Sequence, residues 1–330
     1  ISNAAIQGSV IDSASGAGLS GAAVRFSGNT LTTDSQGLYS QASSAPVARM
    51  VIEGAATGFE SIFGVAEVLG SVPSVNNLRL TPLGTAATIT VASGGTVTQA
   101  ATGASVSVPA NALVAAGGGA APATADVRVT AIDIGSDSNL LSGDFTDSSG
   151  TQVQAYGSVV LSSSTALDVV GGQLLTLQIP LSNRSALTPA SATLYYLDVA
   201  TGRWVADGSA NLVAGAQPHY TADVTRFAQW MVGTAITATQ TVSGCVLDDA
   251  GAPAANVRIA ADGINYSSIA YTTTNAQGQF TLQLPTSSRT AVQGRRGAFL
   301  TNATAVDVQS VPISLLTCLT IPTTNAATMR

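Results

Sequence analysis

Short runs in which every second side chain is apolar recur along the whole chain. Residues 106–108, 125–130 and 175–179 each follow this pattern, and Gly, Asn, Asp or Ser separates one run from the next. A side-chain period of two is the signature of a β-strand, and turn residues at such intervals are typical of sandwiches. The best helical candidate is a turn or two within residues 110–116, after Pro109. We therefore predict an all-β fold, and a length of 330 residues predicts two or three domains.

The exterior of this protein must be wetted mainly by hydroxyl and amide groups. Charged residues make up only 9% of the chain, against about 25% in an average soluble protein. All 12 basic residues are arginines, so a Walker-type phosphate loop and Schiff-base catalysis are excluded. A net charge of −6 without a basic patch argues against nucleic acid as a partner. Such a composition is common in secreted β-proteins and unusual in cytosolic enzymes.

The two cysteines, Cys245 and Cys318, both lie in the last third of the chain, each in a strand-like segment. An even count fits an oxidising compartment. Two interpretations stay open. We favour a disulfide, which would close a loop of about 73 residues and contribute about 4 kcal/mol; the alternative is two buried free thiols.

The sequence also bears on location. No run approaches the roughly 18 apolar residues of a transmembrane helix, and the first residues lack the basic and apolar regions of a signal peptide. We expect an extracellular or bacterial cell-surface protein whose signal peptide has already been removed.

One pattern occurs twice, near each end of the chain. Residues 8–12 (GSVID), 23–26 (AVRF) and 33–39 (TDSQGLY) match residues 244–248 (GCVLD), 256–259 (NVRI) and 274–280 (TNAQGQF). In both copies a strand ends in an acidic turn, a second strand follows, and a hairpin turns on Asx-x-Gln-Gly. The glycine supplies the left-handed backbone that this turn needs, and Asp or Asn bonds to its own backbone. The aromatic residue two positions after the glycine, Tyr39 or Phe280, is expected in the core.

This repeated pattern resembles the carboxypeptidase regulatory-like family of small transthyretin-like sandwiches. The resemblance covers about residues 1–82 and 238–322, and it implies one such module at 1–82 and another at 236–330, the second holding the cysteine pair. In that family these modules serve as stabilising, spacing or binding appendages, commonly on bacterial surface proteins.

The intervening stretch, residues 83–235, differs from both copies. Its marks are residues 106–113 (VSVPANAL), 156–161 (YGSVVL), 194–198 (LYYLD), 202–204 (GRW) and 227–230 (FAQW). This set resembles the β-sandwich of ZU5-type domains and cartilage-intermediate-layer-like extracellular proteins. Some ZU5 relatives cleave themselves at a His-Phe-Ser sequence, but here the matching residues are Arg226, Phe227 and Ala228. The resemblance implies three tandem β-sandwich domains without self-cleavage.

Candidate catalytic residues are few. His219 is the single histidine, and no Gly-x-Ser-x-Gly elbow occurs. One histidine and two cysteines cannot supply a zinc site. The glutamates, Glu53, Glu60 and Glu67, all lie in the first module, where strands and their connections account for them. We predict no catalytic and no cofactor-binding residues, and no enzyme.

One acidic segment is the best metal candidate. Asp133, Asp137, Asp144 and Asp147 are mixed with Ser and Gly. Oxygen ligands of this kind suit calcium, although the spacing is not that of an EF-hand. The other interpretation is a solvated loop in which the aspartates cap turns. Calcium is therefore the only cofactor that the sequence suggests.

The scarcity of charge leads to a hypothesis about assembly. Sheet edges are usually guarded by charges, lysine above all, yet residues 158–161 and 174–177 carry none and would be unprotected if they lay outermost. The uncharged ends, residues 1–6 and 320–327, would suit donation as strands to a neighbour. We predict an extracellular structural protein, a self-assembling subunit of a bacterial surface filament, sheath or matrix, with copies of itself or other surface proteins as partners.

The alternative is a surface adhesin or a carbohydrate-binding stalk module, with a glycan as partner. Tyr195, Tyr196, Trp204 and Trp230 are the aromatic residues that would line a sugar platform. Their positions on alternating strands favour packing in the core instead.

Overall fold

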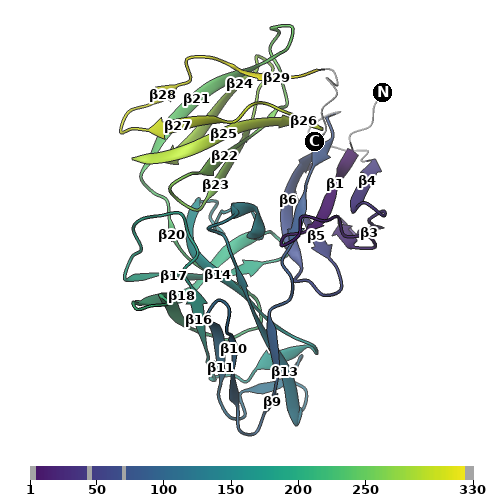
Figure 1. Ribbon diagram of the computed structural model, residues 1–330, viewed down its shortest axis with the longest axis vertical. Helices are drawn as coiled ribbons and strands as arrows, with labels where there is room; N and C mark the ends of the chain where they lie inside the picture. The colour runs from purple at the N-terminus through teal and green to yellow at the C-terminus, as the bar shows by residue number, and fades with distance from the viewer. Residues whose placement is uncertain (1–4, 43–46, 69–71, 324–330) are drawn as a thin grey trace.

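The computed structural model describes residues 5–42, 47–68 and 72–323, and it is all-β as predicted (Figure 1). Within these residues the helical content is a single 3₁₀ turn, η1 (Ser138–Leu140). The strands form three groups along the chain, which we call the N-terminal unit (β1–β8), the central unit (β9–β20) and the C-terminal unit (β21–β29). None of the described helical segments is long and apolar enough to cross a bilayer.

The two terminal units share one topology. The N-terminal strands are β1 (Ala5–Asp12), β2 (Ala23–Phe26), β3 (Asn29–Thr32), β4 (Leu38–Ala42), β5 (Val47–Ala55), β6 (Ile62–Val68), β7 (Ser74–Val75) and β8 (Leu78–Leu80). The C-terminal strands are β21 (Thr239–Asp248), β22 (Arg258–Gly263), β23 (Ile269–Thr273), β24 (Gln279–Pro285), β25 (Ser288–Arg296), β26 (Phe299–Leu300), β27 (Thr304–Val308), β28 (Ile313–Ser314) and β29 (Leu319–Ile321).

Strand pairing makes the correspondence explicit. One N-terminal sheet has the order β4-β1-β7, with β8 parallel to β1, and one C-terminal sheet has the order β24-β21-β28, with β29 parallel to β21. The second sheets are β3-β2-β5-β6 and β23-β22-β25-β26, with β27 also on β25. Each unit encloses its own apolar core. The repeat predicted from the sequence is therefore confirmed as a repeat of topology.

The Asx-x-Gln-Gly turns have the predicted hydrogen bonds and backbone angles, but they do not join the two strands of a hairpin. Asp34 Oδ1 accepts from the backbone N–H of residues 36 and 38 at 2.9 Å, and Asn275 Oδ1 accepts from those of residues 277 and 279 at 3.0 and 2.9 Å. Gly37 and Gly278 have φ of 77° and 71°. The prediction of a hairpin was wrong, because β3 and β4 belong to different sheets, as do β23 and β24. The turn carries the chain from one sheet to the other.

The aromatic residues after these turns, Tyr39 and Phe280, are 5% and 4% exposed, as expected for core residues. The disulfide Cys245–Cys318 is also present, with 4.6 Å between its Cα atoms. It links β21 to the residue before β29. At the same place in the N-terminal unit, the backbone N–H of Ser9 donates to Asn77 Oδ1 at 3.3 Å. The bridge is therefore a feature of one copy of the repeat.

The main sheet of the central unit has the order β10-β11-β16-β19-β18-β17-β20-β14-β13-β9. Its strands are β9 (Thr85–Thr90), β10 (Gly95–Gln99), β11 (Ala104–Val108), β13 (Thr124–Ile132), β14 (Val153–Ser163), β16 (Leu175–Pro180), β17 (Ser191–Asp198), β18 (Arg203–Val213), β19 (His219–Val224) and β20 (Gln229–Ala235). The outermost strands, β9 and β10, meet at a bridge between Thr90 and Gly94. The sheet thus curls around a large apolar core.

The helical turn expected within residues 110–116 is absent from the structure. Asn111 has a left-handed φ of 58°, which interrupts a helix after less than a turn. The chain then forms β12 (Leu113–Ala115), which pairs with β15 (Leu167–Val169), and Leu113 is fully buried. Burial of Leu113 in the sandwich core therefore overrides the local helical signal.

The edge strands were also predicted at the wrong segments. Residues 158–161 lie in β14, which is paired with β13 and β20. Residues 175–177 lie in β16, which is paired with β11 and β19. Neither strand is outermost, so their lack of charge has a simpler explanation. Both are interior strands whose backbone groups are already satisfied.

The three units do not lie in a row. The C-terminal unit continues the long axis from one end of the central unit, and the N-terminal unit lies beside the boundary between the other two (Figure 1). Strand β6 faces the C-terminal unit, where the Arg258 side chain donates to the carbonyl of Val65 at 3.3 and 3.4 Å. This arrangement creates a junction to which all three units contribute.

Candidate functional site at the junction of the three units

The junction has an apolar centre of its own. A cluster on the central unit includes Phe145, Leu197 and Trp204, all buried, and Ile269 of the C-terminal unit belongs to the same cluster. Phe63 from β6 packs against it. Burial of apolar side chains from all three units stabilises their contact at about 25 cal/mol per Å². The relative placement of the units is thus fixed partly by hydrophobic packing.

Ion pairs also join the three units. Six ion pairs occur among the described residues, and three of them join different units. These three are Arg49–Asp144, Arg79–Asp137 (3.1 Å) and Arg184–Asp262 (2.8 Å). Half of the ion pairs in the described ranges thus lie at unit boundaries, which indicates that electrostatics helps to set how the units dock.

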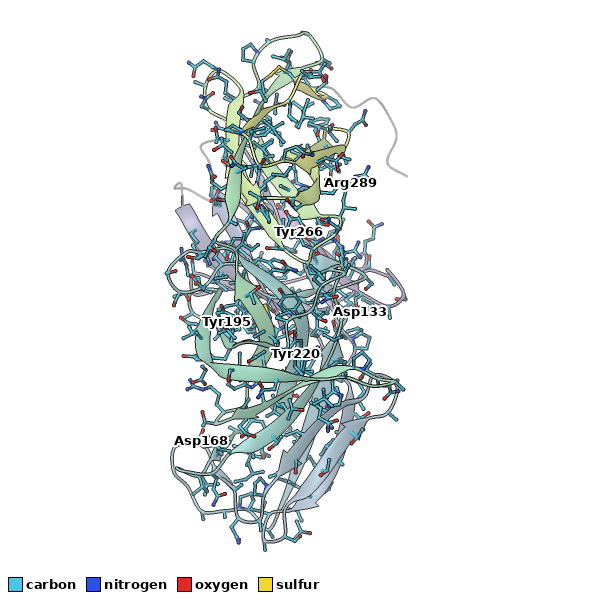
Figure 2. All side chains as sticks on the ribbon, turned by 90° about the vertical axis from the view of Figure 1, so that its left-hand side faces the viewer. Asp133, Asp168, Tyr195, Tyr220, Tyr266 and Arg289 are labelled. Atoms are coloured by element: carbon cyan, nitrogen blue, oxygen red, sulfur yellow. A yellow bond between two sulfur atoms is a disulfide. The ribbon has the colours of Figure 1, made fainter. Side chains whose placement is uncertain are left out.

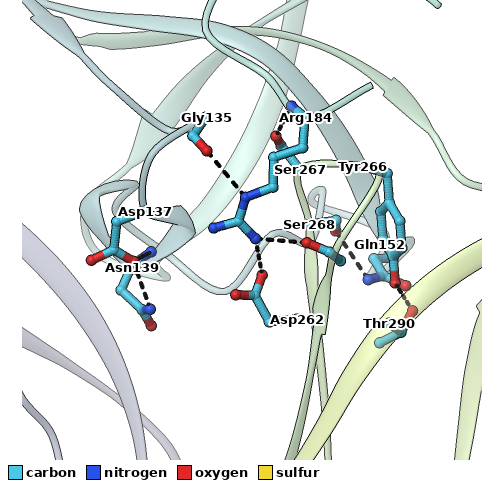
Figure 3. Close-up of polar contacts among 11 residues, drawn as sticks. Gly135, Asp137, Asn139, Gln152, Arg184, Asp262, Tyr266, Ser267, Ser268 and Thr290 are labelled. Atoms are coloured by element: carbon cyan, nitrogen blue, oxygen red, sulfur yellow. Dashed lines mark hydrogen bonds and ion pairs between the residues drawn. The ribbon is translucent and has the colours of Figure 1, made fainter. Parts of the chain in front are cut away.

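Arg184 forms hydrogen bonds both within the central unit and to the C-terminal unit (Figure 3). Its guanidinium donates to Asp262 Oδ1 at 2.8 Å, to the carbonyl of Gly263 at 2.6 Å and to the carbonyl of Gly135 at 3.1 Å. Its backbone N–H donates to Ser267 Oγ at 3.0 Å. Burial raises the pKa of Asp262, and the neighbouring Arg184 opposes that shift. A single side chain thus joins a loop of the central unit to β22.

A groove of about 430 Å³ opens at this junction. The outer face of the C-terminal sheet forms one wall, β6 and residues 75–79 form the second, and residues 138–145 form the third. Clefts of this size between domains are common positions for small-molecule sites. The groove is the best candidate for a binding site in the described part of the chain.

Two arginines face each other across strands in this wall. Arg258 on β22 and Arg295 on β25 are direct register partners, and both line the groove. The Arg258 guanidinium lies over the Tyr271 ring, 4.3 Å from its centroid. Burial lowers the pKa of Arg295, and the charge of Arg258 adds to that effect. Sequence reasoning missed this pair, because the two residues are 37 positions apart, counted as 295 − 258, and only strand register brings them together.

The acidic segment predicted as a calcium site is divided among other contacts. Asp137 and Asp144 pair with Arg79 and Arg49. Asp133 accepts from the hydroxyl of Ser182 at 2.6 Å, and Asp147 accepts from the backbone N–H groups of residues 149 and 151. In the described ranges, no three His, Cys, Asp or Glu residues are placed to hold a metal ion together. Turn capping explains Asp147, and calcium binding by the four aspartates stays a prediction.

Glu60, one of the three glutamates expected to have structural roles in strands or their connections, is a buried carboxylate. It lies just before β6 and is 7% exposed, and it accepts from the Thr130 hydroxyl of the central unit at 2.6 Å. Burial raises its pKa, while Thr130, the charge of Arg128 and Ser162 act in the opposite direction. The contact between the N-terminal and central units is therefore expected to contribute differently to stability at different pH values.

Replacement Glu60→Gln is expected to reduce the pH dependence of stability. A carboxyl whose folded pKa lies above its unfolded value contributes stability at low pH and loses that contribution as pH rises through the folded pKa. The variant keeps an oxygen acceptor for Thr130 but cannot ionise. Urea unfolding at several pH values should show the variant gaining on the wild type from acidic to neutral pH. A constant difference between the two proteins would contradict the assignment.

The other candidate residues have structural roles. Trp204 and Trp230 are fully buried and Tyr195 is 4% exposed, as predicted for core packing. Tyr196 makes an edge contact with Trp230, and the Arg226 guanidinium lies over its ring. Figure 2 shows Tyr195 within the central unit and Tyr266 in the C-terminal unit. These aromatic residues therefore do not form an exposed sugar platform.

His219 begins β19, and its Nδ1 lies 3.0 Å from the carbonyl of Gln217. That contact is local, and it brings no carboxylate or nucleophile to the ring. The structure therefore gives His219 a place at the start of a strand, as the sequence indicated.

No protein-family profile and no curated protein matches the chain. Among solved structures it is similar to the Bacillus anthracis TIE protein (10% identity, 96% of this chain and 51% of that chain, TM-score 0.23). It is also similar to BcpA, the major pilin subunit of Bacillus cereus (7%, 97% and 99%, TM-score 0.22), and to a Ca²⁺-stabilized adhesin of an Antarctic bacterium (12%, 94% and 99%, TM-score 0.14). The chain thus spans about half of the TIE chain, and likeness at this level establishes neither a family nor a function.

Proposed function

We propose that this chain is an extracellular structural protein that assembles with copies of itself through exposed sheet edges. The assembly would be a bacterial surface filament, sheath or matrix. The observation that carries the proposal is a pair of uncharged edge strands, β4 and β24, at equivalent positions in the two terminal units.

Each of these strands has a free side. Among the described strands, β4 pairs with β1 alone and β24 pairs with β21 alone. Their sequences, LYSQA and QFTLQLP, contain no charged residue, and Leu38 is 46% exposed. Unpaired backbone groups on an edge without charges are a template for pairing with another chain. Residues 158–161 and 175–177, within the segments that the sequence analysis considered as unprotected edges, belong to interior strands. Strands β4 and β24, by contrast, are both outermost and uncharged.

Contacts between copies of the chain would form at strand edges more than at the chain ends. Ile6 already pairs with Gln41 within its own unit, and residues 320–321 belong to β29. Of the other parts of the segments considered for donation, residues 1–4 and 324–327 lie outside the described residues, whereas residues 5, 322 and 323 lie within them. Pairing of β4 of one copy with β24 of the next is a head-to-tail contact, which generates an open polymer unless the rotation closes it into a ring.

The proposal extends to location and domain identity. The Cys245–Cys318 disulfide supports an oxidising, extracellular environment. The repeated topology supports carboxypeptidase regulatory-like modules at 1–82 and 236–330, with the ZU5-like domain at 83–235 between them. In this scheme the terminal modules supply the edges, and the central domain spaces them.

A lysine in an edge strand is expected to block assembly without unfolding the protein. Thr281→Lys places a charge at an exposed position of β24, and charged edge residues oppose strand pairing between molecules. Negative-stain electron microscopy and light scattering should show ordered polymers for the wild type and single particles for the variant. The unfolding free energy should change by only about 0.5 kcal/mol.

The matched control is Gln178→Lys, which adds the same charge at an exposed position of β16, a strand paired on both sides. This variant should still assemble. Loss of assembly in both variants would indicate a general charge effect and contradict edge pairing. A wild type that stays monomeric at high concentration would overturn the polymer function and favour the adhesin alternative.

A further inference from the structure

The repeat provides an internal comparison for the Arg258–Arg295 pair. Arg25 and Arg258 occupy the same position in the AVRF and NVRI segments, on β2 and β22. Across the strand, Arg25 faces Glu53 on β5, with Nη1 and Oε1 3.1 Å apart. At the same place Arg258 faces Arg295 on β25. One copy of the fold has an arginine and a carboxylate here, and the other has two arginines.

The two-arginine arrangement is unfavourable by itself. Like charges directly opposite each other across strands are destabilising, and both side chains are partly buried. The Arg295 side chain makes no hydrogen bond or ion pair with any described residue, and Arg258 Nε is buried without a partner among them. The segments outside the described ranges contain no Asp or Glu. The chain thus supplies no side-chain counterion within 4.0 Å of either guanidinium.

The three aspartates around the groove are already paired with other arginines. Asp137, Asp144 and Asp262 each form an ion pair with an arginine other than Arg258 and Arg295. Glu67 lines the adjoining hollow beside Arg258 and Arg295 but forms no ion pair with either. The groove therefore keeps an excess of positive charge at one place on its wall.

We propose that Arg258 and Arg295 bind the carboxylate, sulfate or phosphate group of a small ligand that enters the groove. Such a group would occupy the role that Glu53 has in the N-terminal unit. Two guanidinium groups offer planar sets of N–H donors that match the oxygens of these anions, often in bidentate pairs. A volume of about 430 Å³ admits a ligand of the size of a charged sugar.

The site also joins two units. Arg258 donates to Val65 of the N-terminal unit, so an anion that fixes its guanidinium would strengthen that contact. Binding should therefore stabilise the folded protein, because a ligand with affinity for the folded state alone shifts unfolding by mass action.

The test uses the full chain and three probes: sulfate, inorganic phosphate and glucuronate, each at constant ionic strength against chloride, with glucose as the neutral control for glucuronate. Isothermal titration calorimetry and thermal unfolding are measured on the wild type, Arg295→Glu, Arg295→Gln and Arg289→Gln. Arg289 is the matched control, because it lies on β25 in an exposed ion pair with Asp307. The wild type should bind at least one probe with a saturable rise in Tm, and binding should weaken about tenfold or more in both Arg295 variants.

Arg295→Glu recreates the pair of the N-terminal unit and should have a Tm equal to or above that of the wild type without anion. Arg289→Gln should bind as the wild type does. A response to glucuronate alone identifies a carboxylate of a sugar-sized ligand, and a response to sulfate or phosphate identifies a tetrahedral anion. Absence of saturable binding to all three probes, or undiminished binding by both Arg295 variants, would overturn the proposal.

Discussion

Reduction of the Cys245–Cys318 disulfide is expected to lower the unfolding free energy of the C-terminal unit by about 4 kcal/mol. The bond closes a loop with a sequence separation of 73, and a cross-link of that span restricts the unfolded chain strongly. Domain stabilities lie at roughly 5–15 kcal/mol, so the loss removes a large share of what holds this unit folded. Hydrogen exchange of the β21 and β24 amides, with and without reductant, measures the change.

The N-terminal unit is the internal control for this experiment. At the corresponding place it has the hydrogen bond from Ser9 to Asn77, whose contribution is on the order of 1 kcal/mol. Exchange of the β1 and β4 amides should therefore be unaffected by reductant, and the double variant Cys245→Ser, Cys318→Ser should behave like the reduced protein. Equal acceleration in both terminal units would show that the bridge stabilises the whole molecule, and not one unit.

Much of the fold could be predicted from local sequence patterns. Alternation of apolar residues predicted strands, and the repeated Asx-x-Gln-Gly turn identified two related units, because Gly37 and Gly278 adopt backbone angles that other residues avoid. These features depend on contacts between near neighbours. The sheet change at the same turns was not predictable, because it depends on which strand lies alongside and not on the turn itself.

The edges were misassigned for a related reason. A strand's composition does not state whether it has one neighbour or two. A signal was present in β14, where Val159, Val160 and Leu161 are consecutive apolar residues, because a short continuous apolar run is typical of a buried strand. The partners of two of the four aspartates could not be predicted either, because they depend on which units lie side by side. Asp137 and Asp144 are satisfied by Arg79 and Arg49, which lie in another unit.

Removal of the Arg184 side chain is expected to loosen the contact between the central and C-terminal units. Arg184→Ala deletes the guanidinium bonds to Asp262, Gly263 and Gly135. Asp262 then remains partly buried without its counterion, and breaking such a pair costs about 3 kcal/mol. Urea unfolding should show this loss, and hydrogen exchange should accelerate in β22 before it does in β27.

The matched control, Arg289→Ala, breaks the exposed pair with Asp307 on the same unit, where both side chains are more than half exposed. Such pairs contribute about 0–1 kcal/mol, so this variant should unfold close to the wild type. A double variant, Arg184→Ala with Asp262→Ala, should recover part of the loss, because it removes the uncompensated carboxylate as well. If the double variant is no more stable than Arg184→Ala, the carboxylate is not the source of the cost. The bonds to the two backbone carbonyls would then hold the units together.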